Sequence, residues 1–224
     1  MSLAPRYQEM LLNASLPDKD AYTEEEFFAL DERAEGRWEF VPLHPSPATG
    51  NGALQAGRLG LIRAMAGGTP DHSAIAGNIL STLTTSLRAL GNRTCRVFGS
   101  DLKISAADGR KTYPDLSVVC GKLQMYEARR DTVTNPLVIV EVVSKSTEDD
   151  DRNGKWQSYQ TIPTLAHYVL AASDRPRLDM YTREENGWHY QAIDGLEGLV
   201  TLSALGVTLA LSDIYDLVEW EAGN

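Results

Sequence analysis

The sequence predicts an α/β fold in which helices flank a mixed β-sheet. Two short runs rich in valine and isoleucine, 116–119 and 138–143, have the length and composition of buried strands. Two stretches with helical features, 73–90 and 147–159, precede the first run and follow the second. Because strands that alternate with helices pack as layers, with the helices covering the sheet, this order indicates an α/β architecture.

Length and composition are those of one globular domain. The chain has 224 residues, of which 42% are hydrophobic and 23% charged. No window is apolar for long enough to cross a membrane, and residues 1–19 lack the charged-then-apolar order of a signal peptide. We therefore expect a cytoplasmic protein with a leader at 1–21 and a single domain at 22–224, which carries a Pro/Gly-rich insertion at about 42–58.

The first part of the domain is expected to form one helix and two strands. Three glutamates follow Thr23, and a threonine cap with acids in the first turn is typical of a helix start. This helix should run to Ala34 and end at Gly36. Strands are predicted at 37–41 and 59–65.

The later elements follow from apolar spacing and turn residues. The helix at 73–90 has one apolar face, to which Ile75, Ile79, Leu83 and Leu87 contribute. Further strands are predicted at 94–98, 102–104, 166–170, 178–182, 188–193 and 205–209, with a last short helix at 212–218.

Cys95 and Cys120 are the two cysteines of the chain. Two cysteines give no disulfide framework, and their spacing fits no zinc site. Each lies in or beside a strand-like run, so both are expected to be buried free thiols.

The charge is unevenly distributed along the chain. The net charge is −10, of which residues 1–47 contribute −6 and residues 156–224 contribute −7. Residues 48–87 and 88–155 are slightly basic, at +1 and +2. Nucleic-acid-binding proteins favour basic surfaces, so the net charge argues against nucleic acid. The slightly basic middle part weakens that objection and is compatible with weak contact to DNA, without strong sequence preference.

A carboxylate lies at each of the two strand-like runs that define the fold class. Asp115 directly precedes the first run and Glu141 lies within the second. A buried carboxylate without a partner is costly or takes up a proton, so a lysine from another element or a metal ion is expected beside Glu141. Lys155, on the helix that follows, is placed to reach it. Taken alone, Asp115 also fits a turn residue and Glu141 a salt-bridged core acid.

These residues resemble a known group of nucleases. Pro114-Asp115, followed by an acid in an apolar strand, here Glu141, is similar to the PD-(D/E)-X-K pattern. More narrowly, five segments resemble the Uma-two family of restriction-type endonucleases: Trp38–Val41, Met65–Ile79, Tyr113–Val119, Pro136–Thr147 and Lys155–Tyr159. The resemblance covers most of the chain, about residues 22–215, and implies a restriction endonuclease-like fold.

The resemblance implies an endonuclease that cleaves DNA with Mg²⁺ or Mn²⁺. It assigns the metal ligands to the carboxylates of Asp115 and Glu141 and the backbone carbonyl of Val142. This set suits Mg²⁺, which binds one or two carboxylates and completes its shell with water and substrate phosphate.

The resemblance also assigns residues around the metal. Lys155 is the catalytic lysine, and Glu39 is a further catalytic acid that serves as a ligand or holds a second metal. His72 is expected to contact phosphate or to hold Glu39. Asn78 and Tyr159 are expected to support the site by hydrogen bonds.

Two functions of different classes remain open, an active endonuclease and a catalytically idle nuclease fold that binds nucleic acid or protein. The general superfamily places a lysine two residues after the strand acid, where this chain has Val143. That departure and the acidic net charge favour the idle fold, whereas the joint presence of Asp115, Glu141 and Lys155 favours the enzyme. A phosphohydrolase for nucleotides is a third possible function.

Apolar surface on the segment 178–193 and near the C-terminus predicts a homodimer.

Overall fold

The computed structural model of the chain describes residues 20–33, 36–44, 58–65, 67–127, 129–144 and 147–220. Within these residues, the strands form a large six-stranded sheet, a small six-stranded sheet and a two-stranded ribbon. Both larger sheets contain parallel and antiparallel pairs, which confirms the α/β class with mixed pairing. The chain passes between the two larger sheets several times, because β4 belongs to one of them and β5, β6 and β8 to the other.

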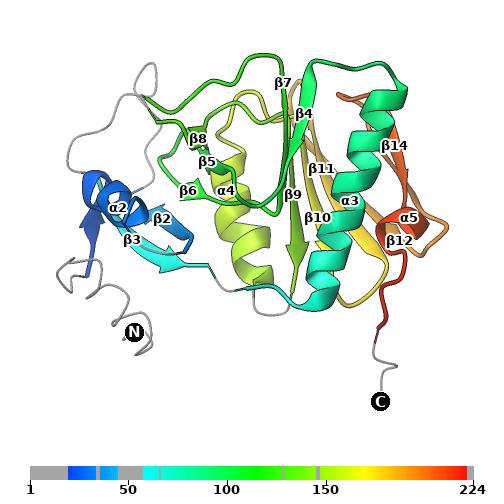
Figure 1. Cartoon of the computed structure of the whole chain (residues 1–224), viewed down its shortest axis with the longest axis horizontal. Coiled ribbons are helices and arrows are strands. Elements are labelled where there is room, and N and C mark those ends of the chain that lie inside the picture. Colours follow the sequence, from blue (N-terminus) through cyan, green and yellow to red (C-terminus); the bar gives the residue numbers. More distant parts are fainter. Residues whose placement is uncertain are drawn as a thin grey trace.

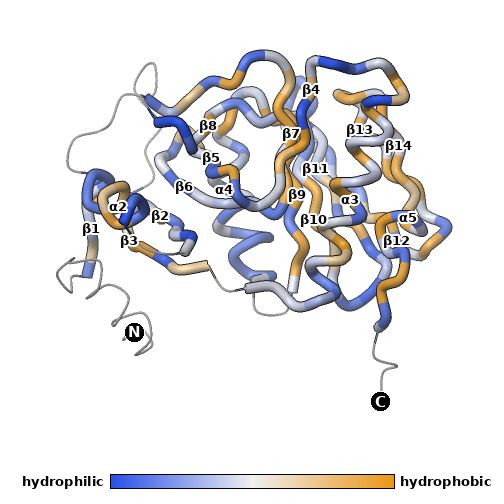
Figure 2. Tube along the Cα trace, in the orientation of Figure 1, coloured by the Kyte–Doolittle hydropathy of each residue, from blue (hydrophilic) through white to orange (hydrophobic). Residues whose placement is uncertain are grey.

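The large sheet is centred on β9 (Val138–Val143). β10 (His167–Ala172) pairs parallel to β9, and β7 (Leu116–Cys120) pairs antiparallel on its other side. The outer strands are β11 (Arg177–Glu184) and β12 (Gly187–Asp194) beyond β10, and β4 (Cys95–Phe98) beyond β7. All residues of β9 are buried, which explains its continuous apolar run, and Figure 2 shows apolar residues gathered in β7, β9 and β10.

The small sheet and the ribbon contain the elements that the sequence did not predict. The small sheet has the order β1 (Tyr22–Thr23), β3 (Leu59–Ala64), β2 (Trp38–Pro42), β6 (Lys111–Thr112), β5 (Lys103–Ser105) and β8 (Thr132–Val133). The ribbon pairs β13 (Leu199–Leu202) with β14 (Val207–Ala210). Strands of two residues, such as β1, β6 and β8, are too short to show an alternating pattern, and β13 was also missed.

Three helices lie where the sequence predicts them, but the long one begins at Pro70 rather than at 73, and the last one ends at Ile214 rather than at 218. α2 (Glu24–Asp31) starts with a capping box between Thr23 and Glu26. α3 (Pro70–Ala89) is capped by Thr69, and the expected residues at a spacing of four form its buried face. A short α5 (Leu211–Ile214) lies near the C-terminus.

The helix expected at 147–159 differs from the prediction in its winding. Its central part is a π-helix, η1 (Asp150–Lys155), and its last turn, α4 (Trp156–Tyr159), is α-helical. A π turn is a wider helical turn with i→i+5 hydrogen bonds, and it leaves no signal in the spacing of the apolar residues. It determines which side chains reach the candidate site, as described below.

The two faces of the large sheet are covered by different elements. α3, the ribbon and α5 pack on one face, against the side chains of Val138, Val140 and Val142. The helix η1–α4 packs on the other face, against Ile139 and Val143. Figure 1 shows α3 and α4 on opposite sides of β9, with the small sheet beyond α4. The candidate site lies on the α4 face.

The expectation of free thiols was wrong. Cys95 and Cys120 lie directly opposite each other on the antiparallel strands β4 and β7 and form a disulfide. Two cysteines far apart in sequence show no pairing pattern, and only the register of the two strands brings them together.

Several expectations stay predictions. Residues 1–19 of the leader and 45–57 of the insertion lie outside the described residues, so the domain division stays a prediction. Among the described residues, no helix is long and apolar enough to cross a membrane. The homodimer also stays a prediction; the apolar surface invoked for it includes Tyr190, 47% exposed, and Leu217, 91% exposed.

Candidate active site

Asp115 and Glu141 lie side by side on one face of the large sheet. Side chains alternate along β9, and because the even-numbered valines face α3, Glu141 faces the opposite side. Leu116 pairs with Val140 in antiparallel register, so Asp115, one residue earlier, falls beside Glu141. Oδ2 of Asp115 accepts a hydrogen bond of 2.7 Å from the backbone N–H of Val142, which ties this carboxylate to the strand that carries Glu141.

His72 holds the other oxygen of Asp115. Its Nε2 lies 2.9 Å from Oδ1 of Asp115, and the cap of α3 places it there, because the His72 N–H donates to the hydroxyl of Thr69. The hydrogen bond to Asp115 raises the pKa of His72, although burial opposes the shift. His72 therefore contacts Asp115, not Glu39 as one expectation had it.

The helix after β9 presents three polar side chains, Asp151, Lys155 and Tyr159, at a spacing of four. In an α-helix one turn holds 3.6 residues, so side chains spaced by four drift slowly around the helix axis in one direction. A π turn holds more residues, since its hydrogen bonds are i→i+5, so side chains spaced by four drift around the axis in the opposite direction. The succession of η1 and α4 therefore keeps these three side chains on the side of the helix that faces Glu141.

Lys155 reaches the site from this helix. Its Nζ lies 3.1 Å from Oε1 of Glu141 and 2.9 Å from Oδ1 of Asp151. The side chain points into the protein, since Lys155 is only 7% exposed. Oε1 of Glu141 also accepts a hydrogen bond of 2.8 Å from the Tyr159 hydroxyl. An ammonium thus stands beside the strand acid even though Val143 occupies the usual lysine position.

Negative charge is in excess at this point of the molecule. Burial raises the pKa of Glu141 well above its ordinary value; Lys155 opposes this shift, and Asp151 and Asp115 add to it. Burial alone would lower the pKa of Lys155, but the attraction of Glu141, Glu39 and Asp151 raises it. One ammonium is therefore shared by two buried carboxylates, Glu141 and Asp151, which is an environment suited to a further cation.

Glu39 lies in an adjoining network that joins the small sheet to the helix. Oε1 of Glu39 accepts a hydrogen bond from the Thr112 hydroxyl, and Arg110 lies 3.8 Å from its other oxygen. Arg110 also pairs with Asp150. A Cβ on Gly154 would collide with Asp150 and come within 3.0 Å of Arg110, so this glycine lets the ion pair lie against the helix.

Asn78 does not support the site. Its amide donates hydrogen bonds of 3.0 and 2.9 Å to the backbone carbonyls of Ile214 and Asp216. Asn78 therefore fixes the C-terminal segment against α3. The expectation was wrong because α3 packs mainly on the face of the sheet that Glu141 does not use, and sequence alone did not show which face each helix covers.

Sequence reasoning missed two residues of the site, Asp151 and Arg110. The spacing of four between Asp151 and Lys155 was a usable signal for a shared face of the helix. Arg110 carried no such signal. It is 2% exposed, and it meets Glu39 only through the pairing of β2 with β6.

The donor chemistry of the site fits a divalent cation with an incomplete protein shell. Among the described residues, no three His, Cys, Asp or Glu side chains are placed to form a metal site by themselves. Two carboxylates, Asp115 and Glu141, are nevertheless adjacent in a buried region with excess negative charge. Mg²⁺ uses one or two carboxylates and takes its other ligands from water and phosphate, so the residues present fit such an ion.

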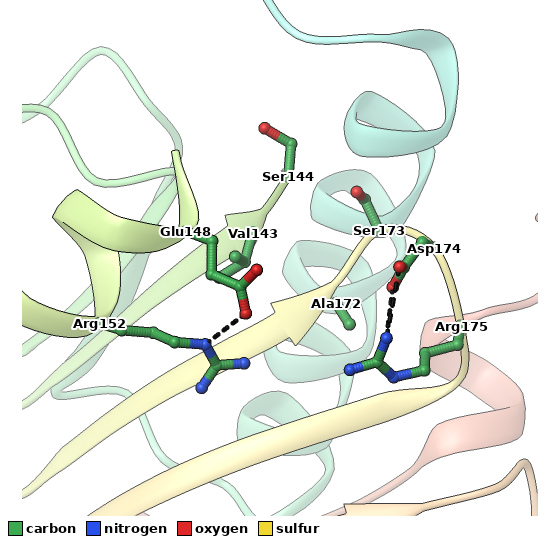
Figure 3. Close-up of a pocket in the computed structure, with 8 residues that line it drawn as sticks. All are labelled: Val143, Ser144, Glu148, Arg152, Ala172, Ser173, Asp174 and Arg175. Atoms are coloured by element: carbon green, nitrogen blue, oxygen red, sulfur yellow. Dashed lines mark hydrogen bonds and ion pairs between the residues drawn. The ribbon is translucent and has the colours of Figure 1, made fainter. Parts of the chain in front are cut away.

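A surface pocket of about 360 Å³ lies at the ends of β9 and β10. Val143 and Ala172, the last residues of β9 and β10, are among its lining residues. Figure 3 shows the ion pairs Glu148–Arg152 and Asp174–Arg175 among the side chains that surround it. The charges of these side chains balance one another, so the pocket has no surplus for an anion.

Comparison with known proteins identifies the family. The model of the Uma2 family, described as "Putative restriction endonuclease", matches residues 53–212. The chain belongs to the Uma2 family. The match includes Asp115, Glu141, Lys155 and Tyr159 but begins after Glu39.

Individual proteins are similar to this chain over most of its length. An uncharacterised protein of Synechocystis sp., slr1290, is 38% identical over 163 residues, which cover 70% of this chain and 80% of that protein. A second protein of the same organism, sll1609, is 29% identical over 143 residues, 63% of this chain and 74% of that protein. The crystal structure of a DUF820 protein from Anabaena variabilis, titled a putative nuclease, has a TM-score of 0.59 at 17% identity. The structural match covers 71% of this chain and 88% of the Anabaena chain. This match supports the restriction endonuclease-like fold.

Proposed function

We propose that this Uma2 protein is a metal-dependent endonuclease that hydrolyses DNA phosphodiester bonds. The observation that carries the proposal is the convergence of Asp115, Glu141 and Lys155 on one face of the large sheet, with the ammonium 3.1 Å from Glu141. Membership of a family described as restriction endonucleases supports it.

In this proposal Asp115 and Glu141 hold Mg²⁺ or Mn²⁺, together with the backbone carbonyl of Val142. When bound, the ion supplies Lewis-acid stabilisation of the phosphate and lowers the pKa of a water. The protein fixes both carboxylates beforehand: His72 and the Val142 N–H orient Asp115, and Tyr159 orients Glu141. Such orienting partners strengthen metal binding by holding the ligands in place.

Lys155 contributes charge to the reaction. Its ammonium is anchored on a helix, buried and kept protonated by the surrounding carboxylates. An ammonium at a phosphate stabilises the charge that develops on the phosphoryl oxygens. Glu39 is held by Thr112 and lies near Arg110, so we assign it a supporting role, in which its charge helps to keep Lys155 protonated.

DNA is proposed as the substrate because the family is described as restriction endonucleases. The net charge of −10 argues for weak contact in which the bound cation supplies part of the attraction to phosphate. We therefore expect cleavage without strong sequence preference and DNA binding that weakens as the salt concentration rises.

The direct test is incubation with supercoiled plasmid and Mg²⁺ or Mn²⁺, with EDTA as the metal-free control. We expect nicked and linear products with the wild-type protein and none with Glu141→Gln, a variant of nearly the same size. Equal cleavage by both proteins would trace the activity to a contaminant and sink the proposal.

The second candidate is a catalytically idle nuclease fold that binds nucleic acid or protein. The observation in its favour is that Lys155 already engages Glu141, while Val143 leaves the strand without its usual lysine. This function predicts that the plasmid stays intact with either Mg²⁺ or Mn²⁺, while a gel-shift assay still detects DNA bound to the protein.

A further inference from the structure

Asp151 is a buried carboxylate to which the proposed reaction has so far assigned no role. It is 2% exposed, and its Oδ1 lies 2.9 Å from Nζ of Lys155. Among the described residues, no hydrogen bond reaches this oxygen. The charge attraction of Lys155 is therefore what holds a carboxylate that would otherwise be costly to bury.

The backbone of Asp151 is fixed from two sides. Its N–H donates a hydrogen bond of 2.9 Å to the carbonyl of Thr147, and its carbonyl accepts one of 3.0 Å from the Tyr168 hydroxyl of β10. The π turn then sets the direction of the side chain. Asp151 is thus a stationary anion beside Lys155.

The ammonium of Lys155 is shared between this stationary anion and Glu141. A divalent cation that binds Glu141 would draw that carboxylate's charge to itself and repel the nearby ammonium. Because Lys155 is 7% exposed, its ammonium needs another anion to remain buried. Asp151 supplies that anion, and it is not part of a ready ligand set among the described residues.

We propose that Asp151 is a positioning residue: it retains the Lys155 ammonium in the site when a divalent cation takes over Glu141. The inference rests on the proposed function, because it presumes that Glu141 is a metal ligand and that Lys155 acts on the phosphate. Without Asp151, cation and ammonium compete for a single carboxylate, and the ammonium leaves when the cation binds.

The position of the ammonium can be observed without activity. A buried, ion-paired lysine ammonium exchanges its protons slowly and gives a resolved ¹H–¹⁵N signal, whereas exposed ammonium signals are broadened by exchange. Loss of the signal in Lys155→Met assigns it to Lys155. Spectra are recorded with and without Mg²⁺, which is diamagnetic. We expect the signal to persist with Mg²⁺ in the wild-type protein and to be lost with Mg²⁺ in Asp151→Asn.

Asp150→Asn is the matched control. Asp150 directly precedes Asp151 on the same turn, and its replacement by asparagine also removes one negative charge. Its ion pairs, however, are with Arg110 and Arg63 and not with Lys155. The signal should persist with Mg²⁺ in this variant. The proposal is overturned if Asp151→Asn retains the signal with Mg²⁺, if Asp150→Asn loses it equally, or if the wild-type protein loses it. Asp151→Ala replaces Asp151→Asn if circular dichroism shows that the latter does not fold.

Plasmid cleavage at saturating Mn²⁺ gives the second readout. Residues that act as a unit have non-additive effects. Asp151→Asn and Lys155→Met should therefore each lower the rate by roughly 10²-fold, and the double variant should be no slower than Lys155→Met. A double variant that is slower by the product of both losses overturns the positioning role. No cleavage by the wild-type protein refutes the proposed function instead, and the ammonium spectra then decide on Asp151 alone.

Discussion

Two buried lysine–carboxylate pairs in this protein have lysine pKa values that are shifted in opposite directions. Lys111 of β6 and Glu24 of α2 lie 2.7 Å apart, with both side chains 0% exposed. Burial lowers the pKa of Lys111 to about 8, although Glu24 opposes the shift. Lys155 and Glu141 are 3.1 Å apart and almost as buried. Burial would lower the pKa of Lys155 too, yet the carboxylates around it raise it.

The difference lies in the number of carboxylates that each lysine meets. Among the residues that the structure describes, Glu24 alone is ion-paired with Lys111, so that pair is balanced and has a structural role in joining α2 to the small sheet. Lys155 is ion-paired with both Glu141 and Asp151, so the candidate site keeps unneutralised negative charge. A buried region keeps such an excess only at a cost in stability, and binding a cation would relieve that cost.

Lys103 sharpens the comparison. It also meets two carboxylates, Asp31 and Asp131. Asp131, however, is 44% exposed and shared with Arg129, so water and a second cation neutralise it. Excess charge that is also shielded from water is therefore the feature that separates the candidate site from the other lysine clusters.

The largest predicted effect is a loss of stability when the balanced pair of Lys111 and Glu24 is broken. Lys111→Met leaves Glu24 buried without its ammonium, and breaking a buried ion pair in this way costs about 3–5 kcal/mol. Urea unfolding should show this loss in the free energy of unfolding. Lys122→Met, at an exposed position, should change it by less than about 0.5 kcal/mol. A similar change in both variants would mean that the Lys111 pair contributes nothing.

The next largest predicted effect is a loss of DNA cleavage when Lys155 is replaced in its cluster with Glu141 and Asp151. Lys155→Met should lower plasmid cleavage roughly 10²-fold without weakening Mn²⁺ binding, because Lys155 is not a ligand. Per folded molecule, Lys111→Met should cleave like the wild-type protein. If the two methionine variants lose cleavage to the same degree, the distinction between the two lysines is wrong.

The balanced pair also predicts a pH dependence of stability. The pKa of Lys111 is about 8 in the folded protein, below the value of about 10.4 for an unperturbed lysine. Between these values the unfolded chain binds the extra proton, so this group makes stability rise with pH, by at most about 1.4 kcal/mol per pH unit. Chemical denaturation from pH 8 to pH 10 should show a steeper rise for the wild-type protein than for Lys111→Met; parallel curves would contradict the shift.

The smallest effect is expected from a single hydroxyl. Tyr159→Phe removes the hydrogen bond to Glu141 and should lower cleavage about 10-fold, the lower end for a residue that orients a metal ligand. Tyr215→Phe is the matched control, since the Tyr215 hydroxyl bonds backbone carbonyls away from the site. It should reduce stability by about 1 kcal/mol and leave the cleavage rate unchanged. Equal rates for Tyr159→Phe and wild type would remove Tyr159 from the site.

The sequence predicted the parts of the site that depend on local rules. The strands and the placement of Asp115 and Glu141 follow from apolar runs with an acid at a defined position. The reach of Lys155 follows from the helix that comes directly after β9. The π turn was not predictable, because a widened turn changes no residue type, and neither was the role of Asp151 that depends on it.

Long-range pairings account for the other differences. Asn78 bonds residues more than 130 positions later, Arg110 meets Glu39 across two strands, and the cysteines pair through the register of β4 and β7. A single sequence carries no signal for contacts of this kind. The same limit explains why one sheet was expected where the described strands form two six-stranded sheets and a two-stranded ribbon.

A Mn²⁺ titration followed by electron paramagnetic resonance tests the central claim most directly, because it reports cation binding without requiring cleavage. We expect the wild-type protein to bind Mn²⁺ with a sub-millimolar dissociation constant and Glu141→Gln to lose this binding. Glu24→Gln, which removes an equally buried acid from the balanced pair, should bind Mn²⁺ like the wild-type protein, provided that circular dichroism shows it folded. Unchanged binding in Glu141→Gln, or equal loss in a folded Glu24→Gln, would contradict the assignment of the excess charge to a metal site.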